Sequence, residues 1–267
     1  MRIRLLALVA ILGLAGTPLA AQRTADQARL SLGLSAGVTT GTTLWTIAGQ
    51  PIFTSSVAVD TVLLSRKTRG ALAVVFHGTY FPGEHWGFTG EAMLLGLGTE
   101  ASCELSFSSG STSGAEICNS INGQETPGSA VGLSVGSMYR IMSRNVISPY
   151  ARVSAGLVIS QHSTIQTDGF FTDPSSQEEV RFTVYDHPVR SHGTPVVGFG
   201  AGFTAALGRG YQLRWELRDN IVGLDQVAGP TFGTPNSEPS RERGWKHVWS
   251  VTFGFDVVLE RRRGRRY

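Results

Sequence analysis

The chain has 267 residues, of which 33 are glycine and only 16% are charged, whereas about 25% is usual for soluble domains. Its formal net charge is +3 at pH 7, and five arginines lie between residues 261 and 266, so the positive charge is concentrated at one end. No nucleic-acid-binding motif accompanies this charge, which excludes a nucleic-acid-binding domain. The length suits one large β domain.

Residues 1–21 have the pattern of a secretory signal peptide. Two arginines precede the apolar run 5–14, and a helix-breaking Gly-Thr-Pro and small residues then lead to Ala21. The run is too short to cross a bilayer as a helix, and no other stretch is apolar enough to do so. We therefore expect cleavage after Ala21 and export of residues 22–267, rather than a membrane anchor or a buried core helix.

The exported part of the chain repeats an alternation of large apolar with small or polar residues. A period of two is typical of β-strands whose two faces meet different surroundings. It recurs in eight segments, at 30–38, 71–80, 86–94, 131–140, 151–160, 197–207, 211–218 and 249–259. In the last of them, WSVTFGFDVVL, one face carries Trp249, Val251, Phe253, Phe255 and Val257.

The links between these segments alternate in length. Three are short and rich in turn residues, FPGEH, IMSRNVISP and GRG. The other four are long and polar, and they cover 39–70, 97–129, 161–195 and 219–247. Structureless loops of this length are uncommon in compact soluble domains. Short turns on one side and long loops on the other are typical of bacterial outer-membrane barrels.

The composition of the two strand faces predicts which face meets lipid. The polar face holds mostly Gly, Ser, Thr and Ala, without lysine, whereas a soluble lipocalin-like barrel would expose many Lys and Glu. Small side chains suit the crowded lumen of a narrow barrel. The apolar face has aromatic residues near the strand ends, as in interfacial girdles: Tyr80, Trp86, Tyr139, Tyr211 and Trp249. We therefore place the apolar face against lipid.

We predict an all-β fold, an eight-stranded antiparallel up-and-down transmembrane β-barrel with four long extracellular loops and three short periplasmic turns. Over most of residues 30–259 the chain resembles the outer-membrane barrels of the OmpA and OmpX type. The last strand of the chain differs from theirs. In the family that strand usually ends on an aromatic residue, whereas here it ends at Leu259 and eight residues follow. The resemblance implies a monomer in the outer membrane of a Gram-negative bacterium, in contact with its lipids and its barrel-assembly machinery.

Cys103 and Cys118 are the two cysteines of the chain, and both lie in the long link 97–129. Two cysteines in an exported chain predict a disulfide between them. The alternative, a two-thiolate metal site, lacks histidines nearby. In the chain-entropy model a bridge over a loop of this size stabilises the fold by about 3 kcal/mol.

Charged residues also occur on the polar face of the strands, where the fold places them inside the barrel. Charges buried in a narrow lumen must pair, so we predict an ion-pair network that plugs it. A gated proton or ion path is the alternative, while an eight-stranded barrel leaves no room for a wide pore. The predicted members are Glu91, Arg140, Arg152, Arg214, Glu216, Arg218 and Asp256.

The stretch GFGAGF places Gly198, Gly200 and Gly202 at alternate positions. A nucleotide-binding glycine loop lies between a strand and a helix, and this context is missing here. We interpret these glycines as packing positions in a thin lumen.

Two further stretches carry side chains that are used in catalysis or metal binding. Ser160 and His162, in SQHST, resemble the Ser and His of barrel enzymes that trim lipid A, but no carboxylate can be assigned to complete a triad. Asp186, His187 and His192 could ligate a metal, but their spacing matches no tight metal-binding motif. We expect neither catalysis nor a metal or other cofactor.

The basic tail 260–267 follows the last strand. With eight strands both termini lie on the periplasmic side, so the tail would contact anionic lipid headgroups or acidic groups of the cell wall, unless it is a disordered, solvated segment. Its cations are Arg261, Arg262, Arg263, Arg265 and Arg266. The expected function is a structural, envelope-maintaining role or binding through the surface loops. A lipid A-modifying enzyme that uses Ser160 and His162 is the second hypothesis, and a narrow channel is the third.

Overall fold

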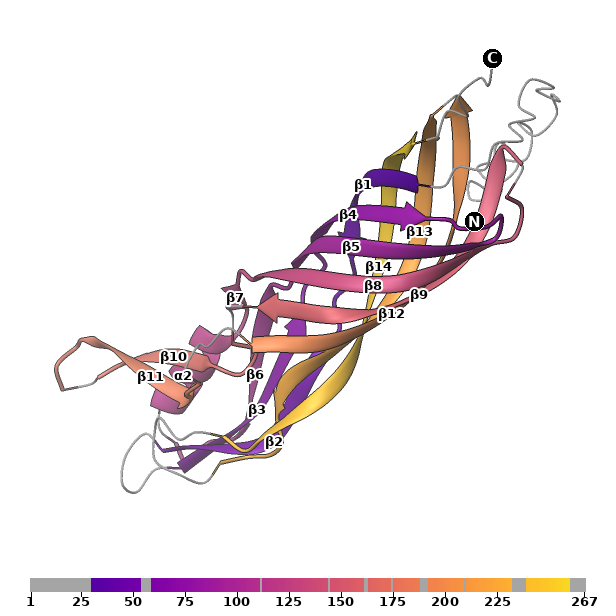
Figure 1. Ribbon diagram of the computed structural model, residues 1–267. Helices are drawn as coiled ribbons and strands as arrows, with labels where there is room; N and C mark the ends of the chain where they lie inside the picture. The colour runs from indigo at the N-terminus through magenta and orange to yellow at the C-terminus, as the bar shows by residue number, and fades with distance from the viewer. Residues whose placement is uncertain are drawn as a thin grey trace, which may run out of the picture.

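The computed structural model describes residues 30–53, 59–110, 112–143, 145–160, 163–173, 175–187, 192–208, 210–231 and 239–259 (Figure 1). Eight strands form a closed barrel in which each strand pairs with its neighbours in the chain and β1 pairs with β14. They are β1 (Leu30–Thr39), β4 (Leu72–Tyr80), β5 (Trp86–Gly96), β8 (Ser129–Arg140), β9 (Ile147–Ser160), β12 (His192–Gly208), β13 (Tyr211–Val227) and β14 (Arg241–Leu259). The predicted eight-stranded antiparallel up-and-down barrel is confirmed, and three short links alternate with four long ones.

The outer surface of the barrel is apolar, as the strand alternation predicts. Phe88 is 62% exposed and Val135 is 71% exposed, while their neighbours Thr89 and Ser134 are buried inside. Exposed apolar surface costs about 25 cal/mol per Å² in water, and a lipid environment removes that cost. The barrel therefore spans a membrane with its apolar face outward. Among the residues that the structure describes, no helix is long and apolar enough to cross a bilayer.

The last three barrel strands are longer than predicted. The expected loop 219–247 is wrong over most of its length, because β13 continues to Val227 and β14 begins at Arg241, with these two residues paired in register. Likewise, β12 begins at His192, inside the expected link 161–195. The outward face of this extension carries polar residues such as Asp219 and His247, so the apolar alternation stops although the strands go on.

The three long links that follow β1, β5 and β9 are folded, whereas the sequence predicted polar loops there. A four-stranded sheet contains β2 (Thr43–Phe53), β3 (Val59–Thr68), β6 (Thr99–Phe107) and β7 (Glu125–Thr126). A hairpin contains β10 (Thr167–Thr172) and β11 (Glu179–Tyr185), and the helix α2 (Thr112–Ile121) packs against β10 and β6. We call these elements the loop layer. They gather at one end of the barrel, opposite the end where β1 begins and β14 finishes (Figure 1).

The loop layer has an apolar core that continues into the barrel. Leu44, Leu64 and Ile117 of the layer belong to the same buried cluster as Val75 and Val158 of the barrel wall. The part of the lumen next to the loop layer is therefore apolar, and it holds larger side chains than the Gly, Ser, Thr and Ala that dominate the polar strand face. The ionic side chains occupy the remaining part of the lumen.

Candidate functional site

Glu91 on β5 is the centre of the ionic part of the lumen, and its side chain is fully buried. Arg218 of β13 donates hydrogen bonds to Glu91 Oε2 at 2.9 Å and to Oε1 at 3.2 Å. Arg152 of β9 donates a further hydrogen bond to Oε1. Two guanidinium groups from two other strands thus hold one carboxylate, which satisfies the requirement that buried charges pair.

Glu216 on β13 shares the same two arginines. Arg218 Nε donates to Glu216 Oε1 at 2.7 Å, and Arg152 Nη1 lies 3.6 Å from that oxygen. The Tyr150 hydroxyl donates to Glu216 Oε2 at 2.7 Å. Glu91 and Glu216 therefore form one hydrogen-bonded unit with Arg152 and Arg218, and this unit links β5, β9 and β13.

Asp256 on β14 is the centre of a second unit. It accepts hydrogen bonds from His77 Nε2 and from Gln212 Nε2, each at 2.8 Å, and Arg214 Nε lies 3.3 Å from its Oδ2. Arg214 also lies 4.0 Å from Glu216 and so connects the two units. Together the units contain three carboxylates and three guanidinium groups, whose formal charges balance.

A glycine makes room for the contact between His77 and Asp256. Gly33 of β1 is paired in register with both residues, since β1 lies between β4 and β14. A Cβ at Gly33 would lie 2.1 Å from Asp256 Oδ1 and 2.5 Å from His77 Nε2. No side chain larger than hydrogen fits there unless the pair separates.

The structure brings together six of the seven charged residues predicted for the lumen, and it leaves Arg140 apart. The guanidinium carbon of Arg140 lies 3.5 Å from the ring centre of Phe81, which is a cation–π contact. Among the described residues no carboxylate lies within ion-pair distance of Arg140. The sequence analysis did not assign His77, Gln212 and Tyr150 to the network, although the alternation along its strand places each of these side chains on the lumen face.

The glycines of GFGAGF face the lumen beside the network. A Cβ at Gly200 would lie 3.0 Å from Glu216 Oε1 and from Arg152 Cγ, and a Cβ at Gly202 would lie 2.1 Å from the Trp215 carbonyl oxygen. These contacts agree with the packing interpretation of the motif.

The predicted disulfide between Cys103 and Cys118 is confirmed. It joins β6 to α2 across a Cα–Cα distance of 5.2 Å. The start of the same helix packs on the buried Asp60 of β3, since a Cβ at Gly114 would lie 1.8 Å from Asp60 Oδ2. Asp60 also accepts hydrogen bonds from the Ser109 amide at 2.6 Å and from the Ser109 hydroxyl at 2.8 Å. The bridge and this carboxylate therefore hold α2 against the sheet of the loop layer.

Arg66 on β3 is a buried cation of the loop layer that sequence reasoning did not single out. Burial lowers the pKa of Arg66 to about 10, and the Asp168 carboxylate partly opposes this effect. The guanidinium lies 5.8 Å from the ring centre of Trp45 and 3.4 Å from the Thr167 hydroxyl. Arg66 thus connects the four-stranded sheet to the β10–β11 hairpin.

The other candidates of the sequence analysis are only partly described. Ser160 ends β9, where its backbone pairs with Ala130 and His192, but His162 lies outside the described residues, so the structure provides no geometry for that catalytic pair. His187 Nδ1 lies 3.3 Å from Arg241 Nη1. In the described ranges no three His, Cys, Asp or Glu side chains are grouped to hold a metal ion. The signal peptide 1–21 and the basic tail 260–267 lie outside the described residues.

Comparisons with known proteins concern the fold. No protein-family model and no curated protein matches the chain. Among solved structures, the outer membrane protein OprG from Pseudomonas aeruginosa has a TM-score of 0.47 at 10% identity, with 88% of this chain and 98% of OprG covered. AlkL in lipid bilayers has a TM-score of 0.42 at 14% identity, with 90% and 95% covered. Neisserial surface protein A has a TM-score of 0.40 at 9% identity, with 86% and 97% covered.

Proposed function

We propose that the protein is a non-enzymatic outer-membrane barrel of a Gram-negative bacterium, with a lumen closed by ion pairs and a loop layer that acts at the cell surface. The observation that carries this proposal is the buried network around Glu91 and Glu216. Three carboxylates and three guanidinium groups occupy the lumen, and none of their side chains is more than 5% exposed. A lumen filled in this way supports a structural or binding role of the barrel rather than a role as a channel.

The loop layer supports a binding or envelope-maintaining role. Mobile loops would need no core, but here the four-stranded sheet and α2 bury Leu44, Leu64 and Ile117 completely or almost completely. A disulfide adds to this rigidity. A preorganised surface loses less conformational entropy when it binds a partner, so the layer is suited to recognition outside the membrane.

A deletion strain tests this function. The strain should become more sensitive to detergent, or it should lose binding at the cell surface that the loop layer mediates. The wild-type gene should restore the phenotype. A variant in which residues 97–128 are replaced by a Gly-Ser linker should insert into the membrane without restoring it. If the deletion instead changes the acyl chains of lipid A in mass spectra, the protein is a lipid-modifying enzyme and the proposal is wrong.

A further inference from the structure

The lumen holds one more cation than its ion-pair network neutralises. The network contains three guanidinium groups and three carboxylates, and Arg140 adds a fourth guanidinium that is only 8% exposed. Arg140 is the last residue of β8, at the end of the barrel opposite the loop layer. The described residues of this part of the lumen therefore carry a formal surplus of one positive charge, and protonation of His77 would only increase it. An uncompensated buried charge is costly.

A second arginine lies beside Arg140. Arg214 of β13 is 2% exposed, and its guanidinium carbon lies 5.3 Å from the ring centre of Tyr150. Tyr150 is also the register partner of Arg140 across β8 and β9. The two guanidinium groups are near enough for their like charges to repel each other. An anion between them would replace this repulsion by two attractions.

Both arginines have buried N–H groups that no acceptor of the described chain satisfies. These groups are Nε of Arg140, and Nε and Nη1 of Arg214. The Arg140 guanidinium lies over the ring of Phe81, which occupies its face but not the donors in its plane. Arg214 Nε lies 3.3 Å from Asp256 Oδ2, but not in hydrogen-bond geometry. Since buried donors are normally paired, these groups indicate an acceptor that the described chain does not supply.

A hydroxyl group belongs to the same part of the lumen. Ser148 of β9, Thr204 of β12 and Arg214 of β13 are successive register partners on three neighbouring strands. All three side chains are buried, and within the described ranges Ser148 Oγ has no hydrogen-bond partner. Two guanidinium groups and a hydroxyl, from β8, β13 and β9, therefore face the same end of the lumen.

The surplus charge favours an anion over a water molecule at this place. A guanidinium group only donates hydrogen bonds. A water molecule can accept one of them, but it neutralises no charge. A monovalent anion accepts hydrogen bonds from several donors at once and balances the surplus. Such charge-assisted hydrogen bonds are also roughly twice as strong as neutral ones.

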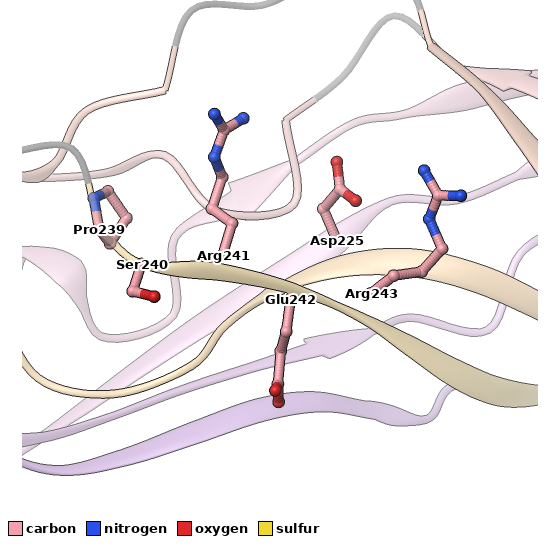
Figure 2. A pocket seen from close by; sticks show the side chains of 6 residues that line it. All are labelled: Asp225, Pro239, Ser240, Arg241, Glu242 and Arg243. Carbon is pink, nitrogen blue, oxygen red and sulfur yellow. The ribbon is translucent and has the colours of Figure 1, made fainter.

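Arg243 on β14 illustrates the opposite situation, that of an exposed arginine. It lines an open surface pocket of about 830 Å³, together with Asp225 and Ser240 (Figure 2). Water solvates such a guanidinium group, and dissolved salt screens its charge. Exposure therefore removes the need for a bound counter-ion at Arg243, whereas Arg140 and Arg214 are shielded from bulk water.

We propose that Arg140, Arg214 and Ser148 bind a small monovalent anion, chloride, inside the barrel at the end opposite the loop layer. The two guanidinium groups donate charge-assisted hydrogen bonds to the anion, and the serine hydroxyl donates a neutral one. The anion connects β8, β9 and β13 and leaves the proposed closure of the lumen in place. This inference goes beyond the proposed binding role of the loop layer, which the deletion strain tests separately.

Anomalous diffraction from crystals grown in sodium bromide locates the anion directly, because bromide replaces chloride and scatters anomalously. The wild-type barrel should show a bromide peak in the lumen next to Arg140 and Arg214. Arg140→Gln should lose this peak, and Arg243→Gln, the matched control at an exposed arginine, should keep it. The absence of a peak at this place in the wild type would overturn the proposal. Peaks on the outer surface alone would mean an adventitious ion only, and would overturn it equally.

Unfolding in urea, in lipid vesicles, provides a readout in solution. A ligand that binds only the folded state raises the unfolding midpoint in a saturable manner. The midpoints of the wild type and of Arg243→Gln should therefore rise when chloride replaces gluconate at constant ionic strength. Arg140→Gln should have the same midpoint in both salts. Ser148→Ala, which keeps both charges, should need a higher chloride concentration for the same rise. An equal chloride response of Arg140→Gln and the wild type would contradict the site.

Discussion

Arg218 on β13 donates two hydrogen bonds to Glu91 on β5, at 2.9 and 3.2 Å, although the two residues come from opposite walls of the barrel. Four strand steps separate β13 from β5 in either direction round the closed ring. An ion pair between opposite walls restricts the width of the barrel at this level. We therefore expect the stability of the barrel and the proposed closure of the lumen to depend on the same contact.

Replacing Glu91 with alanine should destabilise the barrel strongly. Arg152 and Arg218 would both lose a carboxylate inside the lumen, and breaking a buried ion pair costs about 3 to 5 kcal/mol. Urea unfolding of the protein in lipid vesicles, followed by tryptophan fluorescence, measures the loss. Glu242→Ala removes an acid from the exposed end of β14 and should change the free energy of unfolding by less than about 1 kcal/mol. Similar effects for the two variants would contradict the buried network.

Enlarging Gly33 should separate His77 from Asp256. In Gly33→Val the new side chain would occupy the space of the Asp256 carboxylate, because even a Cβ would lie 2.1 Å from its Oδ1. We expect a lower unfolding midpoint in urea. Gly90→Ala is the control, since a Cβ at Gly90 of β5 meets no atom within 4 Å. The register of β1 between β4 and β14 would be wrong if Gly33→Val were as stable as Gly90→Ala.

Removing the disulfide should loosen the loop layer and leave the barrel intact. In the chain-entropy model a bridge over a loop of about 15 residues contributes about 3 kcal/mol, and this one holds α2 against β6. Cys103→Ser with Cys118→Ser should exchange the amide hydrogens of α2 faster, while the barrel strands exchange at unchanged rates. Unchanged protection of α2 would show that its packing alone holds the helix.

The β10–β11 hairpin should lose stability in acid because of Asp168. Partial burial raises the pKa of Asp168, but hydrogen bonds from Arg181, Thr183 and Gln166 outweigh this effect and hold the pKa below its usual value. The stabilisation is therefore present above the unfolded-state pKa of about 3.9 and is lost as the pH falls through the lower pKa of the folded state. Hydrogen exchange of β10 and β11 between pH 5 and pH 2 measures this loss.

Asp168→Asn should be less stable than the wild type at pH 5 and should show little further change toward pH 2. If the variant and the wild type lose protection in parallel as the pH falls, another group is responsible. The contact with the exposed Arg181 should also weaken at high salt.

The basic tail should favour anionic lipid. Juxtamembrane arginines gain about 1 kcal/mol each near a negatively charged surface, and Arg261, Arg262 and Arg263 follow directly after Glu260. Truncation after Glu260 should abolish a salt-sensitive preference for folding into anionic over neutral vesicles. Identical behaviour of the full-length and truncated proteins would remove lipid binding as the role of the tail, and cosedimentation with peptidoglycan would then test binding to the cell wall.

The barrel was predictable from the sequence because lipid imposes a period of two on every strand that crosses it. Where the outward face leaves lipid, as at Asp219 and His247, the period is lost although β13 and β14 continue. The sheet of the loop layer was missed for a related reason, since register irregularities in the pairing of β2 with β3, at 43–45 and 47–50, interrupt the alternation.

The ionic site was only partly predictable. The alternation along each strand identified the charged residues that face the lumen. Their pairing depends on the register between strands, which the alternation within one strand does not specify. Thus His77 meets Asp256 because Gly33 is paired with both of them. Arg140, like Arg152, is on the lumen face of its strand, yet it lies against the ring of Phe81 instead of a carboxylate.

Ion conductance across a planar lipid bilayer tests the closed lumen most directly. The wild-type barrel should show no stable open steps, because Glu91, Glu216 and their arginines fill the lumen. Glu216→Ala should admit ions, since it removes the carboxylate that Arg218 and Tyr150 share. Stable open channels in the wild type, with a conductance equal to that of Glu216→Ala, would contradict a lumen closed by ion pairs.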